Sequence, residues 1–120
     1  GAEAGHFAYV GDSLLGRRVN LGAGTKLANL QLRTPDQKAG REAHSIVLGR
    51  GDDRIDTGLR KLGAVLGDDV EIGCNTVTSP GTLVGPRTWI YSTTTVRKGF
   101  YPADAIVRPG SREMDVTPRT

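Results

Sequence analysis

The chain has 120 residues, of which 37% are hydrophobic and 5% aromatic, and 17 are glycine. A chain of this length is expected to form one domain, and so few aromatic residues argue against a conventional thick core. The formal net charge is +3, but the 16 basic residues are scattered among 13 acidic ones. This pattern is typical of a solvated surface or of a mildly basic groove for a phosphorylated ligand. It lacks the basic face of a nucleic-acid-binding protein, so no nucleic acid partner is expected.

Cysteine content and hydropathy bear on the compartment. Cys74 is the single cysteine, so an intrachain disulfide is impossible and the reducing cytoplasm is the expected location. We find no signal peptide and no apolar run close to 18 residues, so no membrane partner is expected. The chain begins almost inside the repeats described next, which favours a fragment or a domain whose upstream coils are missing.

Residues 6–30 contain apolar residues at intervals of six: Tyr9, Leu15, Leu21 and Leu27. This period is typical of a parallel β-helix, in which each hexad supplies a short strand and a turn, and three hexads make one triangular coil. Side chains alternate along a strand, so the positions two residues earlier should also point inward: Phe7, Ser13, Val19 and Thr25. Glycine follows Leu15 and Leu21, which suits a corner where a side chain would clash or where φ is positive.

Residues 31–62 break this register, because Leu66 follows Leu27 by 39 positions, which is not a multiple of six. The segment is polar and is expected to form a loop that projects from a corner of the β-helix. Loops of this length are usually functional or disordered. Within it, residues 45–48 and 54–56 flank a turn-prone stretch and predict a β-hairpin. No helix is predicted anywhere in the chain.

Residues 63–98 carry a longer ladder with the same period: Leu66, Ile72, Thr78, Val84, Ile90 and Val96. Their expected inward partners are Ala64, Val70, Thr76, Thr82, Thr88 and Thr94. So many β-branched residues disfavour a helix, and six hexads amount to two coils. From Gly99 the pattern decays: Phe100 and Ile106 keep inner positions, Pro102 replaces a ladder aliphatic, and the polar tail is expected to fray.

The sequence therefore predicts one all-β domain over residues 1–120, a parallel β-helix with one long loop excursion. Its first coils span residues 6–30, the projecting loop 31–62, the main coils 63–98, and the C-terminal cap and tail 99–120.

Four segments carry a resemblance to a known family: residues 6–13 (HFAYVGDS), 19–25 (VNLGAGT), 28–30 (ANL) and 56–70 (DTGLRKLGAVLGDDV). They resemble the left-handed β-helix, hexapeptide-repeat acetyltransferase domain of bifunctional glucosamine-1-phosphate acetyltransferase/N-acetylglucosamine-1-phosphate uridyltransferase. They look closer still to the archaeal-type sugar-1-phosphate nucleotidyltransferases that carry such a domain. The resemblance covers roughly residues 5–98 and implies left-handed coiling, acetyl-CoA as co-substrate, and a homotrimer with active sites between adjacent β-helices.

The resemblance also implies roles for seven residues. His6 matches the general base, Tyr9, Asn20 and Lys61 match residues at the sugar phosphate, and Asn29, Cys74 and Ser92 match positions near the cofactor. An imidazole with an ordinary pKa of about 6.5 suits a base near neutral pH.

Most of these residues also have a purely structural interpretation. His6 could simply cap a coil, and the ring of Tyr9 is explained by packing at a ladder position. Asn20 could stack in an asparagine ladder, and Lys61 could be a solvated loop lysine. Cys74 is better explained as a small hydrophobe than as a nucleophile, because the family reaction is direct transfer.

Departures from the family pattern leave a second interpretation open. Leu30 replaces the family's aromatic residue, the basic residues of the coils upstream of His6 are absent, and no nucleotidyltransferase domain is present. The alternative is a non-catalytic trimerisation or regulatory β-helix domain of a sugar-1-phosphate nucleotidyltransferase. A β-helix carbonic anhydrase would need three zinc-binding histidines, whereas this chain has only His6 and His44, so no metal is expected.

Overall fold

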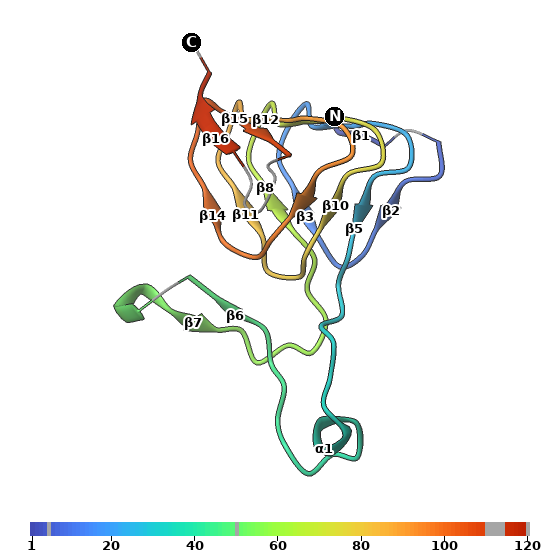
Figure 1. Ribbon diagram of the computed structural model, residues 1–120, viewed down its shortest axis with the longest axis vertical. Helices are drawn as coiled ribbons and strands as arrows, with labels where there is room; N and C mark the ends of the chain where they lie inside the picture. The colour runs from blue at the N-terminus through green and yellow to red at the C-terminus, as the bar shows by residue number, and fades with distance from the viewer. Residues whose placement is uncertain (5, 50, 110–114, 120) are drawn as a thin grey trace.

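The computed structural model describes residues 1–4, 6–49, 51–109 and 115–119. Short strands wind repeatedly around a narrow core and form a parallel β-helix with three sheets (Figure 1). We call these sheets A, B and C, in the order in which the chain first enters them. The chain passes through them repeatedly in that order, so three strands complete one coil. The predicted β-helix is therefore confirmed, whereas its left-handed sense stays a prediction.

Each sheet stacks one strand from every coil. Sheet A contains β1 (Glu3–Ala4), β4 (Asn20–Leu21), β9 (Glu71–Ile72), β12 (Trp89–Ile90) and β15 (Ala105–Arg108). Sheet B contains β2 (Tyr9–Val10), β5 (Lys26–Leu27), β10 (Val77–Thr78) and β13 (Thr95–Val96). Sheet C contains β3 (Leu14–Leu15), β8 (Val65–Leu66), β11 (Leu83–Val84) and β14 (Phe100–Tyr101).

The core consists of the two inward positions of each hexad. The predicted ladder residues from Leu66 to Val96 and their partners from Ala64 to Thr94 are all buried. Buried threonine hydroxyls donate hydrogen bonds to corner carbonyls, for example Thr76 Oγ1 to Tyr91 O at 2.8 Å and Thr88 Oγ1 to Pro102 O at 2.6 Å. These bonds help such a core to remain stable, since a buried polar group needs a partner. Thr78 Oγ1 is an exception, because it is buried without a partner among the described residues.

The first coil departs from the predicted register. Strand pairing sets Val10 beside Leu27 and Tyr9 beside Lys26, so Val10 and not Tyr9 holds the ladder position. Leu15 then follows Val10 by five positions, one fewer than in a regular hexad. Tyr9 points outward and is 50% exposed, and Phe7, expected to point inward, is 93% exposed with φ of 59°. The inward positions predicted for Tyr9 and Phe7 are therefore wrong.

The last coil repeats this shortening at the same corner, between sheets B and C. Tyr101 follows Val96 by five residues, is buried, and donates a hydrogen bond from its hydroxyl to Arg97 O at 2.7 Å. Phe100 is 69% exposed, and Val107 takes the inner place expected for Ile106, so those two predictions are wrong.

The C-terminal tail contains one more strand. Residues of β16 (Asp115–Pro118) pair antiparallel with β15 at the end of sheet A. The predicted fraying is therefore wrong for this strand.

Glycine follows ladder residues because consecutive coils approach closely there. A Cβ on Gly73 would lie 2.5 Å from Ser92 N, and one on Gly85 would lie 2.5 Å from Ala103 N. Neither glycine has a positive φ. Of the two reasons expected from the sequence, the steric one is therefore correct.

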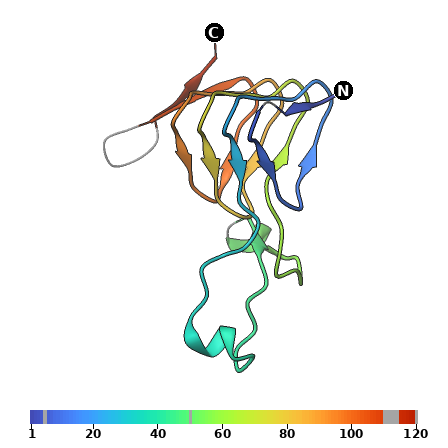
Figure 2. The ribbon, with the colours of Figure 1, turned by 90° about the vertical axis from the view of Figure 1, so that its right-hand side faces the viewer.

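The excursion between β5 and β8 projects from the corner between sheets B and C (Figure 2). The predicted hairpin is confirmed: β6 (Val47–Leu48) pairs antiparallel with β7 (Ile55–Asp56) across the 3₁₀ turn η1 (Gly51–Asp53). Ile46, beside the hairpin, is fully buried, and its Cγ2 would lie 3.1 Å from a Cβ on Gly81. The hairpin is therefore anchored on the β-helix.

The excursion also contains a helix that was not predicted, α1 (Pro35–Lys38). Thr34 and Gln37 form a capping box around its first turn, and proline occupies a first-turn position. These are sequence signals for a helix start, so the expectation of no helix was wrong.

Candidate functional site

Three of the predicted site residues form a column along the corner between sheets A and B. Hydrogen bonds join the turns of consecutive coils there: Gly24 N to His6 O at 2.9 Å, Asn75 N to Ala23 O at 2.9 Å, and Thr93 N to Cys74 O at 2.8 Å. His6, Ala23, Cys74 and Ser92 consequently occupy equivalent places in four successive coils. Coils stack at about 4.8 Å, so His6 lies roughly 10 Å along the edge from Cys74.

The side chains of this column are open to solvent. His6, Cys74 and Ser92 are all exposed, and Ala23 between them adds only a methyl group. A ligand that runs along the edge could therefore contact three coils without any rearrangement.

A shallow groove of about 470 Å³ lies beside the column, on the outer face of sheet A. Its lining includes three predicted site residues, Asn20, Cys74 and Ser92, together with Glu71 and Trp89. Sequence reasoning missed Glu71 and Trp89. Each comes one position before a ladder residue and therefore points outward from its strand. That position was the signal available in the sequence.

The antiparallel strands β15 and β16, which we call the C-terminal hairpin, bring two guanidinium groups to aromatic residues of the same groove. The guanidinium of Arg119 lies 3.9 Å from the ring centroid of Trp89, and that of Arg108 lies 5.4 Å from that of Tyr91. Such cation–π contacts orient a guanidinium. One nitrogen of each group already donates within the protein, Arg119 Nη1 to Arg87 O at 2.8 Å and Arg108 Nη1 to Thr117 Oγ1 at 2.6 Å. The groove therefore has positive charge beside it that could meet an anionic ligand.

A second cluster occupies the corner between sheets B and C. The hydroxyl of Tyr9 donates to Asn29 Oδ1 at 3.2 Å, and Asn29 Nδ2 donates to Asp12 Oδ2 at 2.5 Å. Gly11 makes room for them, since a Cβ there would lie 2.5 Å from Asn29 Cγ and 2.8 Å from Tyr9 Cε1. Asp12 was not identified from the sequence as a site residue.

Lys61 lies beside this second cluster, where the excursion returns to the β-helix. It forms an isolated antiparallel bridge with Leu30, and the next residue, Leu62, donates its N–H to Asn29 O at 3.0 Å. The structure thus brings Tyr9, Asn29 and Lys61 together. It holds His6, Cys74 and Ser92 at the other edge of sheet B, with Asn20 in the groove next to them.

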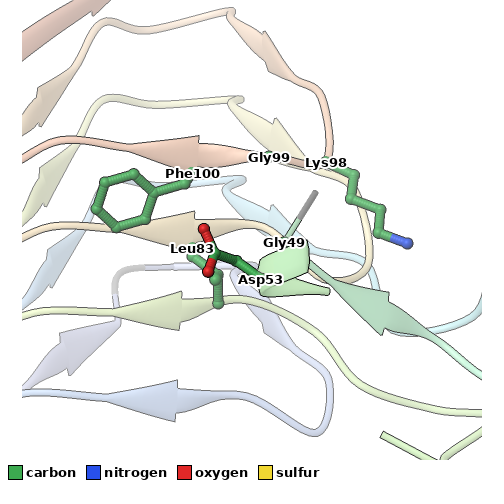
Figure 3. A pocket seen from close by; sticks show the side chains of 6 residues that line it. All are labelled: Gly49, Asp53, Leu83, Lys98, Gly99 and Phe100. Atoms are coloured by element: carbon green, nitrogen blue, oxygen red, sulfur yellow. The ribbon is translucent and has the colours of Figure 1, made fainter. Parts of the chain in front are cut away.

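Another hollow of about 640 Å³ lies between the excursion and the last coils (Figure 3). Leu83 and Phe100 supply apolar surface, while Asp53 and Lys98 add charged groups to its lining. None of the seven predicted site residues lines it.

The clear pKa shifts belong to two ion pairs and to Asp56 of the excursion, all away from both clusters. A hydrogen bond from Ser45 lowers the pKa of Asp56. A hydrogen bond from Arg18 lowers the pKa of Asp69, and one from Arg87 lowers the pKa of Asp104. These four residues lie at the corner between sheets C and A and link consecutive coils. They are structural contacts between coils, although shifted groups can also mark functional sites.

Among the residues that the structure describes, no group of three His, Cys, Asp or Glu side chains is placed to hold a metal ion. Within the same residues, no helix combines the length and apolar character needed to cross a membrane.

Comparison with known proteins identifies relatives of the chain. No family model matches. The bifunctional sugar-1-phosphate nucleotidylyltransferase/acetyltransferase of Sulfurisphaera tokodaii is 42% identical over 91 residues, which are 76% of this chain and 20% of that protein. The bifunctional protein GlmU of Methanocaldococcus jannaschii is 34% identical over 85 residues, or 71% of this chain and 18% of the relative. The GlmU of Synechococcus sp. (strain JA-3-3Ab) is 33% identical over 110 residues, or 92% and 15%.

This chain is a homologue of the GlmU-type bifunctional transferases. The family resemblance read from the sequence is thereby confirmed. The chain spans about a fifth of the length of the first of these relatives and less of the others. What the whole GlmU-type proteins do therefore bears on this chain only as a proposal.

Proposed function

We propose that this chain is an acetyl-CoA-dependent N-acetyltransferase domain that acts on an amino-sugar 1-phosphate, as part of a cytoplasmic enzyme of sugar-nucleotide biosynthesis. The observation that supports this proposal best is the exposed column of His6, Cys74 and Ser92 along one edge of the β-helix. Such an edge can hold an extended thioester cofactor along several coils and place a base at the reacting end of that cofactor. The GlmU-type homology agrees with this interpretation.

In the proposed reaction, the amine nitrogen of the sugar attacks the carbonyl carbon of the acetyl thioester. A C–N bond forms, the C–S bond breaks, and the sulfur leaves as the thiolate of coenzyme A, which becomes the thiol when the base passes on the proton it took from the amine. His6 takes the proton that the amine nitrogen loses, so the nitrogen ends as a neutral amide. Most of the acceleration would come from holding amine and thioester in contact, because proximity removes the entropic cost of their encounter.

The remaining residues are assigned to the two substrates. Asn20 and Lys61 are placed at the sugar phosphate, where the ammonium of Lys61 supplies a point charge. Asn29 lies near the thioester, while Cys74 and Ser92 follow the pantetheine arm along the edge. Arg108 and Arg119, held on the aromatic residues of the groove, would meet the phosphates of coenzyme A.

We also propose a homotrimer. Every outward position of sheet C is apolar: Leu14, Val65, Leu83 and Phe100. Leu14 is 65% and Phe100 69% exposed, and such a stripe favours burial on a second copy. In a single chain the edge with His6, Cys74 and Ser92 and the corner with Asn29 lie on opposite sides of sheet B. Packing of one chain against the next would bring one chain's edge with His6 to the other chain's Asn29.

The direct test is acetyl transfer from acetyl-CoA to glucosamine 1-phosphate and galactosamine 1-phosphate, measured by the mass of the product. Mass detection avoids thiol dyes, which could react with the exposed Cys74. We expect turnover by the wild type and a loss of at least about a hundredfold in His6→Ala, the usual range for a general base. His44→Ala removes the other histidine, which lies in the excursion, and is the control; because His44 is buried, the fold of this variant is checked as well.

Two results would contradict the proposal. A His6→Ala protein that remains a trimer and keeps the wild-type rate would remove His6 from the mechanism. A folded trimer of wild-type protein that transfers nothing to a broad panel of amino sugars would favour the non-catalytic trimerisation or regulatory domain.

A further inference from the structure

Lys26 is the charged residue on the outer face of sheet B. The outward residues of its four strands are, in the order of the coils, Tyr9, Lys26, Val77 and Thr95. Lys26 pairs in register with Tyr9, so their Cα atoms are about 4.8 Å apart. The lysine side chain is exposed, and no carboxylate among the described residues forms an ion pair with it. Its ammonium group can therefore bind an anion from solution.

This ammonium group is held at the corner that carries His6. Lys26 Nζ donates to Gly24 O at 2.8 Å, and Gly24 N in turn donates to His6 O at 2.9 Å. One glycine and two hydrogen bonds thus connect the charge to the backbone of the proposed base. An ammonium group has three N–H donors, so two remain for a ligand after the bond to Gly24.

The proposed substrate brings a phosphate close to its own amine. In glucosamine 1-phosphate the two groups are attached to neighbouring ring carbons. When His6 takes a proton from the amine, the phosphate must therefore lie near His6 as well. A phosphate is a dianion that a lysine binds as a point charge. A cation at the corner with His6 is consequently in the right place to hold it.

The other cations assigned to phosphate groups lie further from His6 in the same chain. Lys61 is at the opposite edge of sheet B, where it bridges to Leu30. Arg108 and Arg119 belong to the C-terminal hairpin, at the other end of the β-helix. Lys26, by contrast, needs no second chain to reach the corner with His6.

We propose that Lys26 is a further binding residue for the sugar phosphate, whose ammonium holds the phosphate beside Tyr9 while the amine meets His6. This inference rests on the proposed function, and it agrees with the role at the phosphate that the family resemblance implies for Tyr9. Sequence reasoning missed Lys26 because an outward lysine is equally typical of a solvated surface. The structural alternative is that Lys26 only caps the carbonyl group of Gly24.

The proposal is tested with Lys26→Met and two acceptors, glucosamine 1-phosphate and glucosamine. We expect kcat/KM to fall at least about tenfold with glucosamine 1-phosphate, because a charge-assisted hydrogen bond is lost, and to change less than about twofold with glucosamine, which has no phosphate. Lys26→Arg should keep most of the rate, since it keeps the charge. Lys38→Met, in the exposed helix α1, is the control for a lost lysine and should keep the wild-type rates.

Three results would overturn the proposal. Equal losses with the two acceptors in Lys26→Met would place Lys26 at the phosphates of coenzyme A or in the support of the corner. An undiminished rate with glucosamine 1-phosphate would remove Lys26 from the site. A Lys26→Arg protein as impaired as Lys26→Met would show that the positive charge is not what the substrate needs.

A binding measurement without turnover separates this inference from the proposed function. Glucose 1-phosphate has no amine to acetylate, so its binding can be followed by NMR through the backbone amides of His6 and Gly24. We expect it to shift these signals in the wild type and in Lys38→Met but not in Lys26→Met, and we expect glucose to shift them in none. Signals that do not respond in the wild type, or still respond in Lys26→Met, would overturn the inference. If they respond as expected but the wild type transfers no acetyl group, the proposed function fails and the phosphate site stands.

Discussion

The carboxylate of Asp69 receives two hydrogen bonds from the guanidinium of Arg18 in the preceding coil, at 2.6 and 3.0 Å. Arg87 holds Asp104 in the same two-point manner one coil further on, at 2.7 and 3.0 Å. Both pairs lie at the corner between sheets C and A, so charges of alternating sign follow this edge. The two pairs join consecutive coils where the backbone turns.

These pairs predict a dependence of stability on pH. The pKa of Asp69 and that of Asp104 lie below the ordinary value of 3.8 in the folded protein, each mainly because of its arginine. A lowered pKa contributes stability above the unfolded value, and the contribution disappears as pH falls through the folded value. We expect the double variant Asp69→Asn/Asp104→Asn to have a lower Tm than wild type at pH 7 and the same Tm near pH 2.

Salt gives an independent check on the same pairs. All four side chains are well exposed, so the difference in Tm should be small and should shrink further in 1 M NaCl. Asp52→Asn/Asp53→Asn, in the excursion, is the control for lost negative charge. A difference in Tm between wild type and the Asp69/Asp104 double variant that persisted unchanged at pH 2 would show that the pairs are not its cause.

The close approach of consecutive coils at Gly73 predicts a cost for any side chain there. In Gly73→Ala the new Cβ would meet Ser92 N at 2.5 Å, and backbone cannot move aside as a flexible side chain can. We expect the free energy of unfolding to fall by about 1–3 kcal/mol, the usual cost of overpacking. Urea denaturation followed by circular dichroism measures this change.

Gly99→Ala is the matched control for this prediction. Gly99 also lies at a corner, but the nearest atoms to an added Cβ are 4.0 Å away. Its substitution should leave the free energy of unfolding nearly unchanged. Equal losses in Gly73→Ala and Gly99→Ala would mean that the short distance between coils at Gly73 is not the cause of the effect.

The regular repeat made much of the fold predictable, because every buried residue from Ala64 to Val96 except Gly81 follows from counting by six and by two. The two places where the spacing shortens to five, from Val10 to Leu15 and from Val96 to Tyr101, could not be recognised in the sequence. A spacing of six starting at Tyr9 fits the sequence as well as a spacing of five starting at Val10, and only pairing with the next coil distinguishes them. Hydropathy could not decide, since tyrosine and valine both suit a ladder position.

The candidate site was predictable to a smaller extent for a related reason. Asp12 and Asn29 are 17 residues apart, about one coil, so their contact depends on the exact length of each corner. The excursion increases the separation between stacked residues further, to 51 positions for Arg18 and Asp69. Contacts across the insertion cannot be found by counting until the register beyond it is known.

The anchoring of the excursion on the β-helix predicts where local unfolding can be induced. Ile46 is fully buried and packs near Gly81, whereas Ile55 on the partner strand of the hairpin is 63% exposed. We expect Ile46→Ala to remove about 2–4 kcal/mol of this packing. Amide hydrogen exchange should then accelerate in residues 45–57 and stay slow in residues 64–96.

Ile55→Ala is the control, since it removes an isoleucine side chain from the same hairpin without opening a cavity. Its exchange pattern should match that of the wild type. If Ile46→Ala accelerated exchange equally in the hairpin and in the coils, the excursion would unfold only together with the β-helix, and a separately anchored element would be ruled out.

Trp89 is the only tryptophan in the chain, so its fluorescence reports on the C-terminal hairpin. The guanidinium of Arg119 covers its ring at 3.9 Å and also donates to Arg87 O at 2.8 Å. Arg119→Ala should uncover the ring, which is now 37% exposed, shift its emission to longer wavelength and increase quenching by acrylamide. Arg33→Ala, in the excursion, should change neither property. Unchanged quenching in Arg119→Ala would mean that the hairpin does not shield the groove in solution, and the guanidinium would then lack the fixed position that phosphate binding there requires.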